Sequence, residues 1–323
     1  VLDVGPGDFA DERSRLHGRT NNWHLNIAGL KNLDIIGAGP HLTRIIQGSN
    51  EIWELDAIVR MDNASQVRLS GLHIPVEVSS NEFDHACIRI NSCDGIVLDN
   101  LWLSGPRSVD TRNGHGVYVS GTTGADGIVV SHVLIEGFGQ GLYTTALGGW
   151  AHSNLLRYCT IAAQDGSFDI DDGIGVWHRV GGGAAGNHLR AERCIFANLP
   201  ANRATFGVGM RVDNSLNYNT EGNVIIYSFE NNYYNCGADG MSWYQPVLSE
   251  LEDNSATNDV SLDPLFYINS DRLPYCSDLE YGWQPVPEAG AGGLLLGFTI
   301  YNLRRTIWGR RSHRGARKTF DRV

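Results

Sequence analysis

Acidic side chains cluster in a short stretch just before Gly173, where Asp169, Asp171 and Asp172 stand close together. Neighbouring carboxylates repel each other's charge, which raises the pKa of one and leaves the other ionised. Such a pair can act as general acid and base in glycoside hydrolysis. Carboxylate oxygens also bind Ca²⁺, so the three aspartates form a candidate calcium site. Ca²⁺ is the only cofactor that the sequence suggests.

Asp239 is a second candidate partner for Asp172, because both residues stand directly before a glycine. On equivalent corners of stacked strands, two coils apart, their carboxylates would be about 9.6 Å apart, twice the strand spacing. An inverting hydrolase needs about 6.5 to 9.5 Å between its carboxylates, which this spacing approaches. Asp-Gly is also a common turn dipeptide, so a structural role for Asp239 stays open.

A lyase would use some of the same residues in other roles. Elimination from a uronate needs a neutralised carboxylate, through Ca²⁺ or arginine, and a base that removes the α-proton. Arg211 is one candidate base, although an arginine base requires a strongly lowered pKa. His178 and His115 are easier bases, and each is also compatible with a structural role. The sequence leaves hydrolysis and elimination open.

Basic and aromatic residues recur at one position of a repeated segment, in which a small residue precedes an apolar, a variable and an apolar residue. The variable position holds Arg89, Tyr118, Tyr143, Gly175, Arg211 and Ser242. Tyrosine rings stack on sugars, and arginine binds carboxylates through paired hydrogen bonds. This pattern predicts a surface for an extended polysaccharide, while the same residue types also suit a solvated strand face. The predicted substrate-binding residues are Arg89, His115, Tyr118, Tyr143, Trp177, Arg179 and Asp213.

Short strands must position these residues, because apolar and variable residues alternate between residues 60 and 245 without a helical period. A second pattern, apolar-x-apolar-x-x-apolar-x-apolar, precedes the small-residue segments. Its copies begin at Val67, Ile96, Ile128, Asn154, Leu189 and Val224, at intervals of 26 to 35 residues.

Short strands that recur at this interval, with glycines at the corners, predict an all-β parallel β-helix solenoid in which each turn stacks on the preceding one. Equivalent positions of neighbouring turns then lie about 4.8 Å apart. Cys159 and Cys194 occupy the same inward position of successive repeats, so we expect a buried pair. The disulfide pairing of the six cysteines stays open.

Several segments resemble the pectate-lyase-like (pectin-lyase-like) superfamily of right-handed parallel β-helix proteins. Residues 4–9, 33–39 and 43–46 are similar to the first coils of that family, and residues 263–266 to the segment that closes such helices. The resemblance covers residues 1–285. It implies a right-handed parallel β-helix domain in this range.

Three strings resemble the polygalacturonase branch: Asp171-Asp172-Gly173-Ile174, Gly114-His115-Gly116-Val117 and Gly209-Met210-Arg211-Val212. Their order departs from that branch, in which the paired aspartates precede the histidine. Asp213 also stands where a lysine is expected after the arginine. The catalytic assignment of the branch is therefore not carried over as a unit. The candidate catalytic residues are Asp171, Asp172, Arg211, His178 and Asp239.

Residues 286–323 are predicted to form a separate tail, with an uncharged stretch at 289–303 and an arginine cluster at 304–322. With Pro287-Glu288 ahead of it, this order resembles bacterial PEP-type C-terminal sorting signals, and Ala289 replaces the second proline. The uncharged stretch is short for a membrane span. The resemblance implies a secreted or cell-surface bacterial protein that contacts the membrane or sorting machinery through this tail only. The alternative is an amphipathic or basic extension.

The body of the chain is acidic, because the tail holds eight of the 25 basic residues while the whole chain carries a net charge of −11. Phosphate binding needs clustered cations, which excludes nucleic acid as a partner of this body. We therefore expect a polysaccharide partner and an exported polysaccharide lyase or glycoside hydrolase. The alternative is a non-catalytic surface or matrix protein that binds glycans or adheres. The sequence leaves the oligomeric state open.

Overall fold

A computed structural model gives the fold of the 323-residue chain. It describes residues 1–9, 25–46, 57–76, 86–105, 114–120, 126–145, 155–162, 173–179, 187–197, 199, 208–213, 224–229, 231–234, 236, 241–244, 256–257, 267–268 and 274–275. The secondary structure of these residues is all β, as the sequence predicts, and parallel sheets form a β-solenoid.

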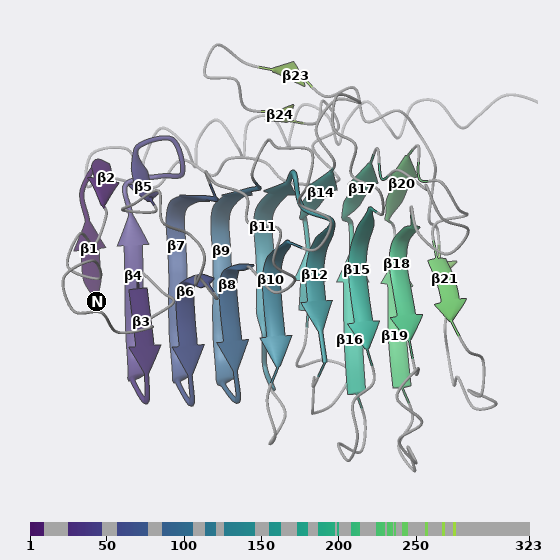
Figure 1. The fold of residues 1–323 in the computed structure, drawn as a ribbon, viewed down its shortest axis with the longest axis horizontal. Helices are drawn as coiled ribbons and strands as arrows, with labels where there is room; N and C mark the ends of the chain where they lie inside the picture. The colour runs from purple at the N-terminus through teal and green to yellow at the C-terminus, as the bar shows by residue number, and fades with distance from the viewer. Residues whose placement is uncertain are drawn as a thin grey trace, which may run out of the picture. The chain divides into compact units, whose positions relative to one another are not determined.

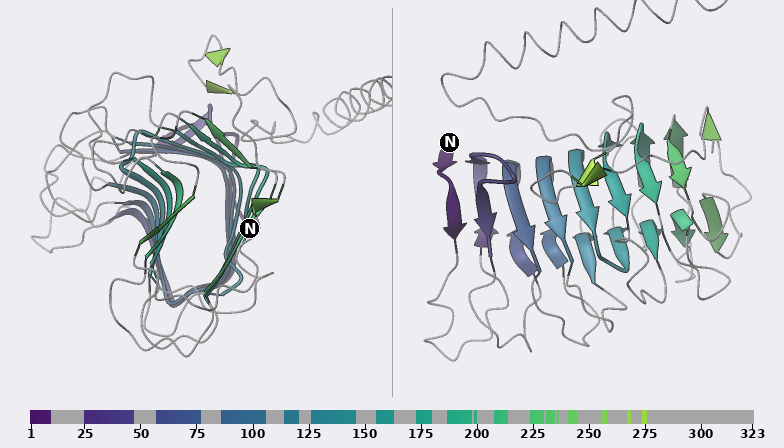
Figure 2. Two further views of the ribbon diagram at one scale, coloured as in Figure 1. Left: turned by 90° about the vertical axis from the view of Figure 1, so that its right-hand side faces the viewer. Right: turned by 90° about the horizontal axis from the view of Figure 1, so that it is seen from above.

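One wall of the solenoid is a parallel sheet of eight strands, which we call sheet B (Figures 1 and 2). Its strands follow one another in chain order, one from each coil. They are β3 (Leu25–Ala28), β6 (Ala57–Asp62), β8 (Ala86–Asn91), β10 (His115–Ser120), β12 (Gln140–Thr144), β15 (Ile174–Arg179), β18 (Val208–Asp213) and β21 (Met241–Tyr244).

The other wall is a sheet of 14 strands, sheet A. Its main path is β1 (Leu2–Val4), β4 (Lys31–Gly37), β7 (Ser65–Pro75), β9 (Asp94–Ser104), β11 (Val129–Glu136), β13 (Leu155–Arg157), β16 (Asn187–Glu192), β19 (Val224–Phe229) and β22 (Ala256–Thr257). A second path holds β2 (Gly7–Phe9), β5 (Thr43–Ile45), β14 (Thr160–Ala162), β17 (Ile195–Ala197) and β20 (Asn232–Tyr234). A separate antiparallel pair is β23 (Tyr267–Ile268) with β24 (Pro274–Tyr275).

A bend divides the sheet A segment of each coil and explains the two adjacent variable positions of the sequence pattern. In β7, Val67 and Leu69 point inward before the bend, and Leu72 and Ile74 point inward after it. The residue that makes the turn has a positive φ, which reverses the alternation of side chains. The turning residues are Gly71, Asn100, His132, Tyr158 and Arg193, with φ between 50° and 66°.

The interior is filled by the inward apolar side chains of both sheets, stacked coil upon coil. Leu69, Leu98, Val130 and Leu156, for example, pair in register along sheet A and are 0–2% exposed. Because each strand adds the same kind of side chain at the same depth, burial continues along the stack. The core therefore runs along the solenoid.

Glycines at the start of the sheet B strands allow the two walls to approach closely. A methyl group added to Gly141 would meet the side chain of Ile161 and would lie 2.6 Å from the carbonyl oxygen of Gly175. Gly116 and Gly175 have equally crowded surroundings. This row explains the small residue that recurs in the sequence pattern.

Contacts within the chain group residues 1–286 into one unit and residues 287–323 into another. The predicted boundary at 285/286 and the sorting tail concern residues outside the described ones and stay predictions. Within the part of the chain that the structure describes, no helix has the length and apolar character needed to cross a membrane.

Candidate functional site

The outer face of sheet B brings basic and aromatic residues of successive coils into one row, which we call the sheet B column. Register pairs join Arg60 to Arg89, Arg89 to Tyr118, Tyr118 to Tyr143 and Tyr143 to Trp177, and the row continues at the strand positions of Arg211 and Ser242. Neighbouring strands of a sheet are about 4.8 Å apart, so the row is continuous.

The column differs from the sequence prediction at β15, where Trp177 takes the place predicted for Gly175. Gly173 and Gly175 both fit the small-residue position, and a shift by two residues leaves the inward and outward alternation unchanged. Packing decides between them, because a methyl group at Gly175 would lie 2.5 Å from the ring of Phe196. The repeat also extends two coils earlier than predicted, through Arg60 on β6 to Asn26 on β3.

The members of the column pack against one another. The Arg89 guanidinium carbon lies 4.8 Å from the centre of the Tyr118 ring. The ring centres of Tyr118 and Tyr143 are 5.1 Å apart at an angle of 38°, and those of Tyr143 and Trp177 are 5.1 Å apart at 58°. Tyr143 is only 8% exposed, whereas Tyr118 and Trp177 are partly exposed. A ligand would therefore meet mainly Arg89, Tyr118 and Trp177.

A second row, at the start of the same strands, borders the column. His115 lies opposite Gln140, and its ring stacks on Tyr143 with 4.9 Å between centres and an angle of 12°. His115 is 3% exposed and Gln140 is 7% exposed, so both side chains are buried. Among the described residues, the side-chain oxygen of Gln140 finds no hydrogen-bond partner. His115 thus joins the predicted face but lies below its surface.

The structure places His178 inside the coil, so it is not an exposed base. It is 0% exposed, and its Nδ1 lies 2.6 Å from the hydroxyl oxygen of Thr144 on the neighbouring strand. Trp177 points outward, and alternation in a strand then directs the next residue inward. The alternation of inward and outward residues in the sequence would therefore have been enough to predict that His178 points inward.

The register of β15 differs from the one that we predicted. Ile174, two residues after Asp172, lies opposite Gln140. The predicted alignment of Asp172 with Gln140 is therefore wrong, and the spacing of about 9.6 Å that was derived from it loses this support. Asp169, Asp171, Asp172 and Asp239 themselves lie outside the described residues.

For the predicted residues Arg179, Arg211 and Asp213, the structure gives the strand position and the pairing partner. Arg211 lies opposite Trp177, and Asp213 lies opposite Arg179, on β18 and β15. Parallel pairing thus brings all four positions to one end of sheet B. The described residues contain no group of three side chains suited to a metal ion, and the predicted Ca²⁺ ligands fall outside them.

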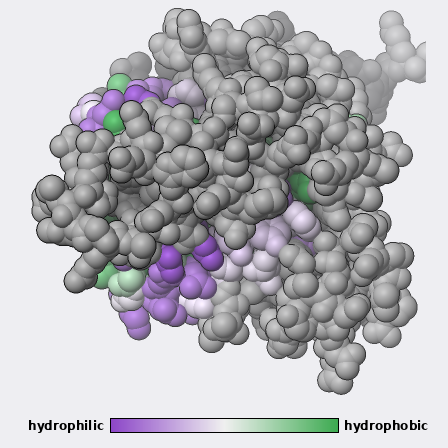
Figure 3. All heavy atoms as spheres, viewed as in Figure 1, coloured by the Kyte–Doolittle hydropathy of each residue, from purple (hydrophilic) through white to green (hydrophobic). Residues whose placement is uncertain are grey.

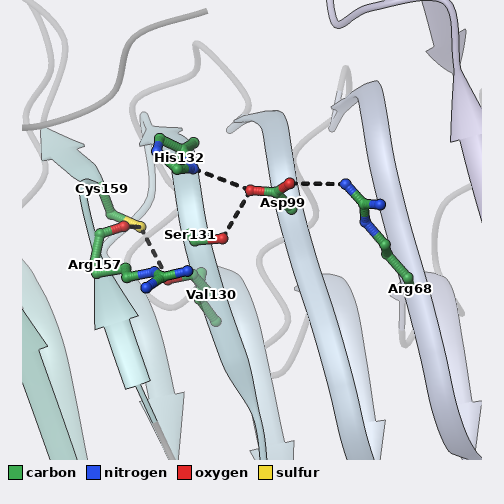
Figure 4. Close-up of polar contacts among 7 residues, drawn as sticks. All are labelled: Arg68, Asp99, Val130, Ser131, His132, Arg157 and Cys159. Atoms are coloured by element: carbon green, nitrogen blue, oxygen red, sulfur yellow. Dashed lines mark hydrogen bonds and ion pairs between the residues drawn. The ribbon is translucent and has the colours of Figure 1, made fainter. Parts of the chain in front are cut away.

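A polar network that the sequence did not suggest lies on the outer side of sheet A (Figure 4). Asp99 accepts hydrogen bonds from Arg68 at 3.0 Å and from the Ser131 hydroxyl at 2.7 Å, and His132 Nδ1 lies 3.1 Å from the same carboxylate. Burial raises the pKa of Asp99, but these partners outweigh it and lower the pKa to about 2. The network therefore holds an ionised carboxylate.

A second group follows the bend on the same sheet. His73 stacks on Trp102 with 3.8 Å between ring centres, and its Nε2 lies 2.8 Å from the hydroxyl of Ser104. The Trp102 indole donates a hydrogen bond of 2.8 Å to the buried Glu136. Burial and, to a smaller extent, the charge of Arg44 lower the pKa of His73 to about 3. This histidine is neutral near neutral pH.

The described surface in the view of Figure 3 is mostly hydrophilic, with small apolar areas. The exposed large apolar side chains among the described residues belong to the first coils: Val1, Leu2, Phe9, Leu30 and Leu42.

Comparison with known proteins yields no relative, because no family model, no curated protein and no solved structure matches the chain. The assignment as a parallel β-solenoid therefore depends on the strand pairing of the structure.

Proposed function

We propose that this chain is an exported, carbohydrate-active β-helix protein that binds an extended glycan along the outer face of sheet B. The observation that carries the proposal is the register of Arg89, Tyr118 and Trp177 in one row. A strand spacing of about 4.8 Å supplies roughly one contact for each sugar of an extended chain. Aromatic rings bind sugar faces, and arginine binds carboxylates or hydroxyls.

Catalysis is assigned to the end of this face where β15 and β18 pair. Asp171 and Asp172 precede β15 directly in sequence, and Arg211 lies opposite Trp177. A carboxylate pair can serve hydrolysis as acid and base, whereas elimination needs a base and a charge-neutralising group such as Arg211 or Ca²⁺. We accordingly propose a polysaccharide lyase or glycoside hydrolase. Asp239 stays a candidate, and His178 does not.

The wider assignment belongs to the same proposal. A solenoid with variable corners and a polar aromatic face fits the pectate-lyase-like superfamily of right-handed β-helices. The order of Pro287-Glu288, uncharged stretch and arginine cluster fits a sorting signal for export.

One observation favours the non-catalytic alternative. The rings of the column pack on each other, and Tyr143 is nearly buried between its neighbours. A row of this kind can hold a glycan, or stabilise the face, without any reaction. A glycan-binding or adhesive surface protein is therefore the second candidate.

The deciding experiment incubates the full chain with a panel of acidic and neutral polysaccharides, with and without Ca²⁺. Reducing ends are measured in parallel with the ultraviolet absorbance of unsaturated sugars, because elimination creates a double bond and hydrolysis does not. Binding is measured separately by calorimetry. Reducing ends alone indicate a hydrolase, both signals a lyase, and binding alone the second candidate.

Single substitutions test whether cleavage and glycan binding depend on the outer face of sheet B. Asp172→Asn should abolish cleavage and leave binding intact, because it removes the ionisable group and preserves its size. Tyr118→Ala should weaken binding, whereas Tyr158→Ala, at the bend of sheet A, is the matched control. Absence of binding to every glycan, or equal loss in both tyrosine variants, would refute the proposal.

A further inference from the structure

Two buried thiols lie at the same inward position of adjacent coils. Cys159 and Cys194 each follow the turning residue of the sheet A bend, Tyr158 in one coil and Arg193 in the next. Strand β13 pairs with β16 before the cysteines, and β14 pairs with β17 after them. The register on both sides therefore fixes the two residues opposite each other.

Both side chains are 0% exposed, and the two thiols contact each other in the core. Cys159 Sγ donates to the carbonyl of Arg157 at 3.2 Å, and Cys194 Sγ donates to that of Glu192 at 3.2 Å. Burial, followed by the contact with the Cys159 thiol, raises the pKa of Cys194. Both thiols are therefore protected from reagents in the folded chain.

The spacing of the coils suits a disulfide. Opposed residues on neighbouring strands have Cα atoms about 4.8 Å apart, and disulfides span about 4.4 to 6.8 Å. Cys87 has no such partner, because the register places it between Ile58 and Gly116. Among the described cysteines, the pair at 159 and 194 is thus the one that the coil register brings together.

We propose that Cys159 and Cys194 form a disulfide between adjacent coils when the chain folds in the presence of a small-molecule disulfide such as oxidised glutathione. One cysteine thiolate attacks the glutathione disulfide, and one glutathione thiolate leaves. The second cysteine thiolate then attacks the mixed disulfide and displaces the other glutathione. Two cysteine thiols are oxidised, one glutathione disulfide is reduced, and the two protons pass to the departing thiolates.

The bond would close a ring that contains the acidic segment at 169–172 and β15. A ring of this kind reduces the freedom of the unfolded chain and stabilises the folded state. It would tie together the two coils that flank the proposed catalytic end of sheet B. The inference depends on the register of sheet A and is independent of the glycan proposal.

The test refolds the full reduced chain in a mixture of oxidised and reduced glutathione, blocks the remaining thiols under denaturing conditions and digests without reduction. Trypsin cuts after arginine, so Cys159 falls in the peptide 158–179 and Cys194 in the peptide 194–203. We expect these peptides joined, with a mass lower by two hydrogen atoms than their sum, and separated by reduction. We also expect a thermal midpoint several degrees above that of the reduced chain.

Cys159→Ser and Cys194→Ser should each abolish the joined peptide and the gain in thermal midpoint, whereas Cys93→Ser should retain both. Peptide mapping of the unaltered chain decides the matter even if a serine variant folds poorly. Recovery of both peptides with blocked thiols, with glutathione attached or joined to other cysteines would overturn the inference.

Discussion

The outer sides of the two sheets carry similar residue types in different arrangements. On sheet A, charged and polar groups form a hydrogen-bonded network, as Arg68, Ser131 and His132 do around Asp99. On sheet B, the contacts of the column are those of rings and a guanidinium, as between Arg89 and Tyr118. Paired charges hold neighbouring coils together, whereas partly exposed rings offer surface to a ligand. Residue type alone would have suggested a site on either side.

The largest expected effect concerns the glycines that support the sheet B face. Gly141→Ala should lower the free energy of unfolding by about 3 kcal/mol, because the added methyl group meets a backbone oxygen that cannot move away. Chemical denaturation monitored by circular dichroism measures it. Gly5→Ala is the control, since no described residue lies within 4 Å of an added methyl group there. Equal stability of the two variants would contradict the packing argument.

The second prediction concerns the buried His73 of sheet A and its effect on the free energy of unfolding. The pKa of His73 is about 3 in the folded chain, against about 6.5 when unfolded, so acid protonates the unfolded state first. Stability should therefore fall by about 2 to 3 kcal/mol between pH 6 and pH 4 on account of this residue. His73→Gln should remove this part of the pH dependence, as denaturation at several pH values would show. An unchanged slope would exclude His73 as its source.

The Asp99 network should contribute at a lower pH. Because its pKa of about 2 lies below the ordinary value, Asp99 stabilises the fold above about pH 4 and loses this effect as the pH falls towards 2. Asp99→Asn should cost about 2 kcal/mol at neutral pH. Glycan binding by this variant should match that of the unaltered chain. Weaker glycan binding by a folded Asp99→Asn variant would instead indicate that the binding surface lies on sheet A.

The last prediction concerns glycan binding by the sheet B column. Trp177→Ala should weaken glycan binding roughly tenfold, because ring stacking contributes about 1 kcal/mol or slightly more. Trp102→Ala removes an indole from sheet A and should leave the affinity unchanged. Calorimetric titration of both variants with the bound glycan measures the difference. Equal affinities would show that the sheet B column is structural.

The residue pattern alone was enough to predict the parallel β-solenoid and most of the column. Alternating apolar residues fix which side chains point inward, and repeats of 26 to 35 residues fix how coils stack. Arg89, Tyr118 and Tyr143 could be aligned because a glycine or cysteine marks the same position in each repeat. The burial of Cys159 and Cys194 followed from the same alignment and is confirmed.

The three-dimensional structure was needed for features that depend on side-chain volume and on contacts with other coils. Alternation could not choose between Gly173 and Gly175, because a shift by two residues keeps every side chain on its face; the crowding at Gly175 made the choice. The partners of Asp99 come from β7 and β11, and no local pattern links residues so far apart in the chain. Register turns such distant residues into neighbours, and register is fixed only when the coils pack.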